Sequence, residues 1–248
     1  MSALAVIPDA VTLAEDARSL SELQPWLAAR DAETRIEWAL STLSGPHVLS
    51  SSFGAQSAVL LHLATRIRPD LPILLVDTGY LFDETYRFID ELGDRLDLNL
   101  HIVRPELSPQ WLEARHGRLW EQGRDGIERY NRLMKVQPMN AALDLLGART
   151  WIAGLRRSQS ESRRRIDPLM LQDGRWKLHP LFDWSNRDLH QYLRRHDLPY
   201  HPLWNDGYVS IGDRHSTRPI HEVAREEDTR FFGVLRECGL HDSVTSSH

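Results

Sequence analysis

The sequence predicts an α/β fold built on a doubly wound, mostly parallel β-sheet. Short apolar segments of strand length alternate with segments of helical periodicity, and this alternation favours right-handed βαβ units. Of the 248 residues, 41% are hydrophobic and 26% are charged, which is enough apolar material for one sizeable core. We expect an N-terminal segment over residues 1–34, an α/β domain over 35–198, and an irregular C-terminal arm and tail over 199–248.

The predicted strands are short and apolar on both faces. Parallel strands covered by helices on both sides have near-continuous apolar runs, so an alternating pattern is not required. We expect four buried strands and, after residue 165, two shorter strand-like segments. They are His47–Ser51, Ile73–Val76, Leu98–Val103, Thr150–Ala153, Leu169–Leu171 and Trp176–Leu178.

The predicted helices are recognised by an apolar face and by their end signals. Arg35–Leu43 precedes Gly45-Pro46, a pair that ends helices. Asp83 is a candidate cap for a helix that continues to Leu96. The remaining helices are Gln56–Ile67, Pro109–Leu119, Val136–Leu146 and Ser185–His196, the last with Ser185 as its cap.

Ligands of open parallel sheets bind at the carboxyl ends of the strands, so the loops there are the candidate site. Ser50–Ser57 combines hydroxyls, Gly54 and a helix start, which together favour an anion site, although an ordinary serine-capped turn has the same pattern. This loop lacks the Gly-Lys-Ser/Thr ending of a Walker loop. Asp77 in the next loop is suited to ribose hydroxyls or a metal, or to capping a β-turn.

Basic residues add to this candidate site. Arg156 and Arg157 follow a predicted strand and are suited to bidentate contact with phosphate or sulfate. Arg163–Arg165 extends the positive run or forms a solvated charged loop. Lys135 is one of only two lysines among 30 basic residues. A phosphate-binding role and chance explain this rare lysine about equally well.

Cys238 is the only cysteine, so the chain has no intramolecular disulfide, four-cysteine zinc site or iron–sulfur cluster held by four of its own thiolates. A lone cysteine is usually a small buried hydrophobe. Here its polar, glycine-containing setting and the nearby Arg236 and His241 favour a thiolate nucleophile. Any disulfide or thiosulfonate chemistry would then need a thiol from another molecule. The histidines lack standard ligand spacing, so we expect no metal site.

Charge and hydropathy exclude two classes of partner. The net charge of −5 argues against a surface that coats nucleic acid. No apolar run reaches the 18 or so residues of a membrane span, and the start of the chain lacks a positive signal-peptide region. We therefore expect a cytoplasmic protein.

Seven segments, taken in order, resemble the thioredoxin-dependent 3′-phosphoadenylyl sulfate reductases of assimilatory sulfate reduction. Each segment alone is a weak signal, but the set extends over roughly residues 35–242 and is highly specific. The segments are Ser51–Gln56 (SSFGAQ), Asp77–Phe82 (DTGYLF), Leu119–Gly123 (LWEQG), Lys135–Asn140 (KVQPMN), Gly154–Arg157 (GLRR), Tyr200–Trp204 (YHPLW) and Arg236–His241 (RECGLH).

The resemblance implies a fold of the adenine-nucleotide α-hydrolase (ATP pyrophosphatase-like) type with a mobile C-terminal tail. It implies that Cys238 attacks the sulfonate sulfur, assisted by Arg236 and His241, with thioredoxin or glutaredoxin as the reductant. It also implies a homodimer with no bound cofactor. The implied substrate-binding residues are Ser50, Ser51, Ser52, Phe53, Gly54, Gln56, Ser57, Asp77, Thr78, Gly79, Lys135, Gly154, Arg156, Arg157 and Arg218.

Departures from relatives refine the expectation. Related adenylyl sulfate reductases carry extra cysteines for a four-iron cluster, but Asn131–Met134 and Arg214–Thr217 contain none, which favours the 3′-phosphorylated substrate. Gln137 stands where the family usually has Glu, so a charge role there is in doubt. Three alternatives remain: a reductase acting on adenylyl sulfate, an ATP pyrophosphatase-type adenylating enzyme, and a non-catalytic nucleotide-binding protein. The loop pattern of the adenylating enzymes is broken here by Phe53, Ala55 and Gln56.

Overall fold

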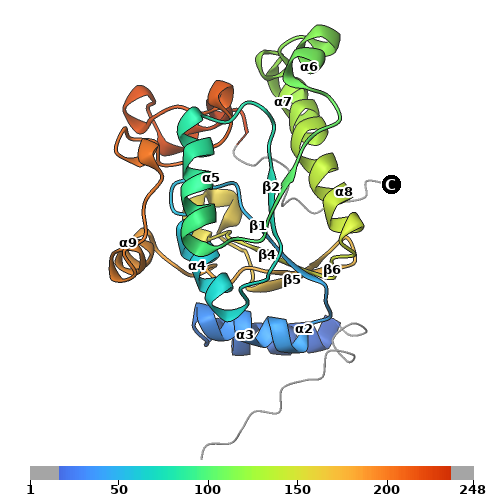
Figure 1. The fold of residues 1–248 in the computed structure, drawn as a ribbon, viewed down its shortest axis with the longest axis vertical. Helices are drawn as coiled ribbons and strands as arrows, with labels where there is room; N and C mark the ends of the chain where they lie inside the picture. The colour runs from blue at the N-terminus through green and yellow to red at the C-terminus, as the bar shows by residue number, and fades with distance from the viewer. Residues whose placement is uncertain (1–16, 236–248) are drawn as a thin grey trace, which may run out of the picture.

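The computed structural model describes residues 17–235, which form a six-stranded sheet with helices on both faces (Figure 1). The strand order is β3-β2-β1-β4-β6-β5, in which all neighbours are parallel except β5 and β6. The doubly wound, mostly parallel sheet is therefore confirmed. The strands are β1 His47–Ser50, β2 Ile73–Val76, β3 Leu100–Val103, β4 Thr150–Ala153, β5 Leu169–Gln172 and β6 Arg175–Leu178.

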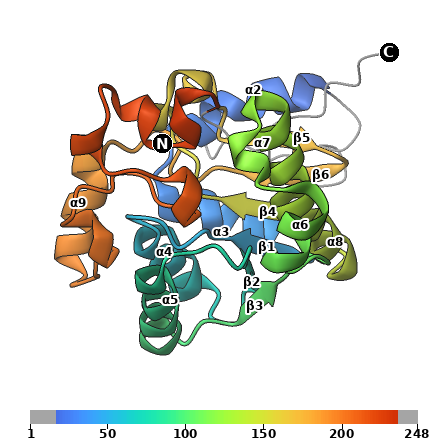
Figure 2. The ribbon, with the colours of Figure 1, turned by 90° about the horizontal axis from the view of Figure 1, so that it is seen from above.

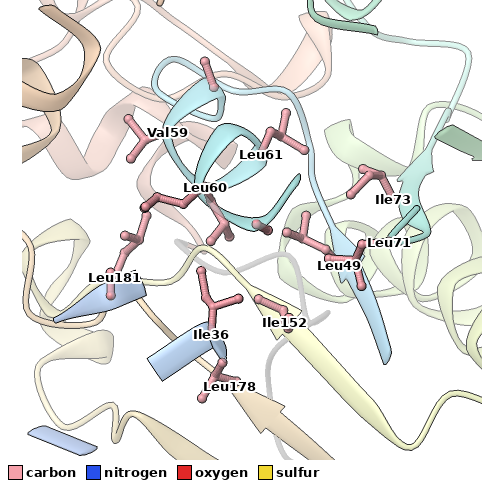
Figure 3. Packing of buried hydrophobic residues seen from close by; sticks show 14 of the residues in the cluster. Ile36, Leu49, Val59, Leu60, Leu61, Leu71, Ile73, Ile152, Leu178 and Leu181 are labelled. Atoms are coloured by element: carbon pink, nitrogen blue, oxygen red, sulfur yellow. The ribbon is translucent and has the colours of Figure 1, made fainter. Parts of the chain in front are cut away.

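Alternate residues of the central strands point to two different cores. Leu49 and Ile152 pack with helices α2, α3, α4, α5 and α9, as part of the main core that Figure 3 shows around Leu60. Val48 and Trp151, one residue earlier in each strand, pack against α8 on the other face. The bounds are α2 Ala17–Ala28, α3 Ala32–Thr42, α4 Ala58–Ile67, α5 Asp83–Leu96, α6 Pro109–His116, α7 Gly123–Asn131, α8 Gln137–Leu145 and α9 Asn186–Arg195.

Several expected elements differ from the observed ones at their ends. Asp83 is the first residue of α5 and does not cap it, because Phe82 occupies the N-cap position. Ser185 does cap α9, and its hydroxyl accepts a hydrogen bond from the Asp188 N–H. Helices α2 and α7 lie where no helix was expected. Leu23 and Leu27 of α2 are buried in the main core, and the boundary drawn between residues 34 and 35 falls inside α3.

The chain after α9 forms short 3₁₀ turns and packs back onto the sheet. The turns are Pro202–Trp204, Arg214–Ser216, Ile220–Glu222, Glu226–Thr229 and Phe231–Gly233. Two backbone bonds join this arm to loops at the strand ends: the His201 N–H donates to the Ala55 carbonyl at 3.1 Å, and the Arg214 N–H donates to the Tyr80 carbonyl at 2.9 Å. In Figure 2 the arm, coloured orange to red, runs from α9 towards α7. Within residues 17–235 no helix has the length and apolar character needed to cross a bilayer.

A buried arginine, paired with an aspartate at the surface, joins the N-terminal helices to the sheet. The Arg35 guanidinium is 1% exposed and forms two 2.7 Å hydrogen bonds to the carboxylate of Asp183, which follows β6. It also donates to the carbonyls of Leu27, Ala28 and Pro180. A buried guanidinium is stable only when its donors are satisfied, so this set of contacts fixes α2 and α3 on the sheet.

We expect Arg35→Met to reduce the free energy of unfolding by about 3 kcal/mol, because it leaves two buried carbonyls, one part-buried carbonyl and a carboxylate without their donor. Urea unfolding measures this loss. Glu33→Ala is the control, since the Glu33–Arg66 pair is half-exposed and 3.9 Å apart, and such pairs contribute at most about 1 kcal/mol. Equal losses in the two variants would contradict the assigned role of Arg35.

Candidate active site

A cavity of about 350 Å³ opens at the carboxyl ends of β1, β2 and β4. Its walls come from the loops that follow these strands, from the segment around Lys135, and from the arm. Ten of the residues predicted to bind substrate line it together. They are Ser50, Ser51, Ser52, Gly54, Gln56, Ser57, Thr78, Lys135, Gly154 and Arg156.

Five other predicted residues are not in the cavity lining. Phe53 is fully buried in the main core, and Arg218 is exposed on the arm. The Asp77 carboxylate accepts hydrogen bonds from the Gly79 N–H at 2.9 Å and from Tyr86, so it holds its own loop in shape. Gly79 has φ +74°, and an added Cβ would lie 2.6 Å from Pro109, which explains the need for glycine there.

Arg157 also lies outside the cavity. Its guanidinium donates to the Ile166 carbonyl at 2.7 Å and lies over the Phe182 ring. The two adjacent arginines thus point in different directions: Arg156 has an extended backbone, and Arg157 begins the 3₁₀ turn Arg157–Gln159. The structure therefore brings Arg156, but not Arg157, into the cavity lining.

Arg156 is a buried cation that lines the cavity. Its side chain is bound only by neutral groups: it donates to Gln56 at 3.2 Å, to Asn186 at 3.0 Å, to Ser158 and to the Trp184 carbonyl. None of these four partners is a carboxylate, although Glu226, which also lines the cavity, and Asp188 act on Arg156 electrostatically. Burial lowers its pKa to about 10, so it is still charged at neutral pH. A buried charge with only neutral partners favours an anionic ligand.

The serine loop supplies hydroxyl groups beside this cation. The Ser57 Oγ is buried and has no hydrogen-bond partner within the described part of the chain. Ser57 precedes α4, and the start of this helix faces the same loop, where the N–H groups of Ser57 and Val59 donate to the carbonyls of Gly54 and Gln56. The Ser50 Oγ accepts a 2.7 Å hydrogen bond from the Trp151 indole. The loop therefore offers hydroxyl donors to an anion beside the start of a helix.

The two lysines have different environments. Lys177 is fully buried, donates to Gln172 at 2.6 Å and lies over the Trp151 ring. Lys135 lies in a π-helical turn, Arg132–Val136, a local widening that is frequent at functional sites. Its Nζ is 2.6 Å from the Asp213 carboxylate at the cavity wall. Although burial raises the pKa of Asp213, the Lys135 ammonium lowers it below its usual value, so the pair is ionic.

The arm contributes cavity residues that sequence reasoning missed. Arg230 lies against Gly212, where an added Cβ would be 2.3 Å from its guanidinium. Gly212 and Asp213 were missed because the stretch has no periodicity and its contacts are made across more than 80 residues of sequence. The lining residues that were not predicted include Gln159, Asn186, Ile211, Gly212, Asp213, Glu226 and Arg230, whereas Arg163 comes from the positive run that the sequence had indicated.

Cys238, Arg236 and His241 lie outside the described residues, so their predicted roles stay predictions. Between residues 17 and 235 no group of three His, Cys, Asp or Glu side chains is arranged to hold a metal ion.

The imidazole ring of His201 is neutral and connects the arm to α5. Its Nδ1 accepts from the Leu203 N–H at 3.2 Å, so the proton is on Nε2, 2.9 Å from the Thr85 hydroxyl. Burial lowers its pKa to about 4, and burial also lowers the pKa of the fully buried His179 to about 4. Both rings are therefore neutral in the folded protein at pH 7.

We expect stability to fall as the pH drops from about 6.5 to 4. The unfolded chain binds protons on His179 and His201 below about 6.5, whereas the folded protein does so only near 4, so acid favours unfolding. Each histidine contributes at most about 1.4 kcal/mol per pH unit. Urea unfolding at pH 7.5, 6 and 5 measures the slope.

His201→Gln should flatten this slope, although it also lowers stability at pH 7.5. His190→Gln is the control, because His190 is exposed on α9. An unchanged slope in His201→Gln would show that another group causes the acid sensitivity.

Known proteins resemble this chain in sequence and fold. Residues 46–219 match the family described as phosphoadenosine phosphosulfate reductase domain. A phosphoadenosine 5′-phosphosulfate reductase from Alkalilimnicola ehrlichii is 60% identical over 225 residues, which cover 91% of this chain and 92% of the relative. A phosphoadenylyl-sulfate reductase structure from Candida auris, a phosphate complex, has a TM-score of 0.72 and 27% identity, and the match covers 82% of this chain and 98% of that one.

A more distant structure shares the fold alone. FMN adenylyltransferase from Candida glabrata matches with a TM-score of 0.56 and 17% identity, over 90% of this chain and 77% of that chain. Together with the strand order, these similarities confirm the α/β fold of the adenine-nucleotide α-hydrolase type.

Proposed function

The chain belongs to the phosphoadenosine phosphosulfate reductase family, and on this premise we propose that it reduces 3′-phosphoadenylyl sulfate to sulfite and adenosine 3′,5′-bisphosphate. The protein is thus an oxidoreductase of sulfate assimilation. The proposed electron donor is a reduced thioredoxin, or a glutaredoxin. The family match extends from residue 46 to residue 219, which includes the serine loop, Lys135, Arg156 and Asp213.

The observation that carries this proposal is Arg156 beside the serine loop. A nucleotide substrate with phosphate and sulfate groups needs donors and positive charge at the carboxyl ends of the strands. The cavity supplies both, since Arg156 has only neutral partners within the described residues and the Ser57 hydroxyl has none. An adenylyl nucleotide therefore matches the chemistry of these walls.

The proposed reaction has two covalent steps. In the first, the Cys238 thiolate attacks the sulfonate sulfur, the sulfur–oxygen bond to the phosphate breaks, and adenosine 3′,5′-bisphosphate leaves. In the second, a thioredoxin thiolate attacks the Cys238 sulfur of the thiosulfonate and sulfite leaves with the electron pair of the sulfur–sulfur bond. The second thiol of thioredoxin resolves the mixed disulfide. Thioredoxin loses two electrons, and the sulfur of the substrate gains them.

Positive charge is needed because both reactants of the first step are anions. Donors fixed in advance near the leaving phosphate stabilise the charge that develops on it. Arg156 is suited to this role because its four protein partners hold the guanidinium in place. The homodimeric state and the cytoplasmic location stay predictions.

We expect Cys238→Ser to abolish sulfite formation and still bind adenosine 3′,5′-bisphosphate. Intact mass after mixing with 3′-phosphoadenylyl sulfate, without thiol, should show one added SO₃ on the native protein and none on the variant. Reduced thioredoxin should remove the adduct. If the serine variant retains a few per cent of the turnover, the nucleophile is another group.

We expect Arg156→Ala to raise the activation free energy by about 2–4 kcal/mol, because it removes a fixed donor from the leaving phosphate. This change lowers kcat/KM about 30- to 1000-fold. Arg157→Ala is the matched control, and we expect a change below about threefold, since that guanidinium binds the Ile166 carbonyl outside the cavity. Initial rates of sulfite release measure both variants. A larger loss in Arg157→Ala than in Arg156→Ala would reverse the two assignments.

A further inference from the structure

We infer that Asp213 is a positioning residue, which holds the Lys135 ammonium at the cavity wall and neutralises its charge. This inference rests on the proposed function for its kinetic readout. Asp213 is 1% exposed and belongs to the arm, whereas Lys135 belongs to the turn between α7 and α8. Its role follows from how many separate segments one carboxylate joins.

Both oxygens of the Asp213 carboxylate are used. One oxygen accepts from the Thr78 hydroxyl at 2.5 Å, in the loop after β2. The other lies 2.6 Å from the Lys135 Nζ and accepts from the Tyr130 hydroxyl at 3.0 Å, from α7. Asp213 therefore joins the arm to two segments that are distant from it in sequence, the loop at Thr78 and the helical segment that contains Tyr130 and Lys135. The bonds from Thr78 and Tyr130 fix the orientation of the carboxylate that Lys135 contacts.

Neighbouring side chains restrict the position of the Lys135 ammonium. Its Nζ lies 5.4 Å from the ring centre of Tyr130 and 5.3 Å from that of Phe231, so aromatic rings approach the ammonium from α7 and from the arm. Tyr130 is itself held in an aromatic cluster in which Trp120 and His215 stack at 3.8 Å. The ammonium is thus fixed from several sides.

This pairing gives Lys135 a different role from Arg156. Lys135 contacts a carboxylate directly, so the pair adds little net charge to the cavity, whereas Arg156 has neutral partners. Lys135 then contributes a donor of fixed direction, and Arg156 contributes net charge. For a reaction that releases a polyanionic nucleotide, a neutralised donor has an advantage: it assists in the transition state without tightening product binding.

Asp213→Asn tests this division because it keeps the shape and removes the charge. We expect adenosine 3′,5′-bisphosphate to bind about tenfold more tightly, measured by calorimetry, because the Lys135 charge is no longer neutralised. We expect kcat to fall at least 30-fold without a rise in KM, because the ammonium is no longer held in place. A purely structural role would instead weaken binding and lower kcat together, and that result would overturn the inference.

Tyr130→Phe provides a milder test in case the Asp213 variant folds poorly. It removes one hydrogen bond to Asp213 from a residue that does not line the cavity. We expect a three- to tenfold lower kcat with KM within twofold. Tyr80→Phe is the matched control: it removes a 2.8 Å bond to Glu113 from the same aromatic cluster and should lower the melting temperature with kcat unchanged. Equal kcat values in the two variants would contradict the inference.

The outcomes also separate this inference from the proposed function. If the native protein binds the bisphosphate but releases no sulfite, the proposed function fails, and the tighter binding by Asp213→Asn still decides the role of Asp213. If the native protein neither turns over nor binds the bisphosphate, both fail.

Discussion

The buried ion pair of Lys135 and Asp213 is the interaction on which the arrangement of the site depends. Removing two opposite charges from water costs several kcal/mol each, and this cost is offset only when the remaining hydrogen-bonding capacity is filled. Here Thr78 and Tyr130 donate to the carboxylate, from a loop of the sheet and from α7. The pair is therefore stable only when three parts of the fold are assembled, so the local geometry of the cavity follows from the global fold.

The fold was largely predictable because its signals are local. The strands at 73–76 and 150–153 and the helix at 83–96 have the bounds expected from apolar runs and periodicity. Helix α2 was missed because a proline lies inside it and its apolar pattern is weak. It is stabilised by Leu23 and Leu27, which are buried in the main core, and by Arg35, which donates to the Leu27 carbonyl. Helix α7 was missed for a related reason: a π-helical turn interrupts the regular spacing between it and α8.

The site was predictable where it follows strand ends and unpredictable where it depends on long-range contacts. Serines and Arg156 in the loops could be assigned because parallel strands bring their carboxyl ends to one edge. The different directions of Arg156 and Arg157 could not, since a pair of like residues carries no information about which one is buried. Asp213 was missed because its partners are distant in the sequence, and an aspartate in a polar stretch has no distinguishing pattern.

The backbone bonds between the arm and the sheet loops have an evolutionary consequence. The His201 N–H and the Arg214 N–H bind the carbonyls of Ala55 and Tyr80, so these two joints do not depend on which side chains are present. Side chains near these two backbone hydrogen bonds can therefore be substituted without removing the donor or the acceptor. Exchange of the whole arm between related chains is instead constrained where side chains meet: at Asp213 and its partners, at the hydrogen bond between His201 and Thr85, and where Leu203 and Ile211 pack against Ala55.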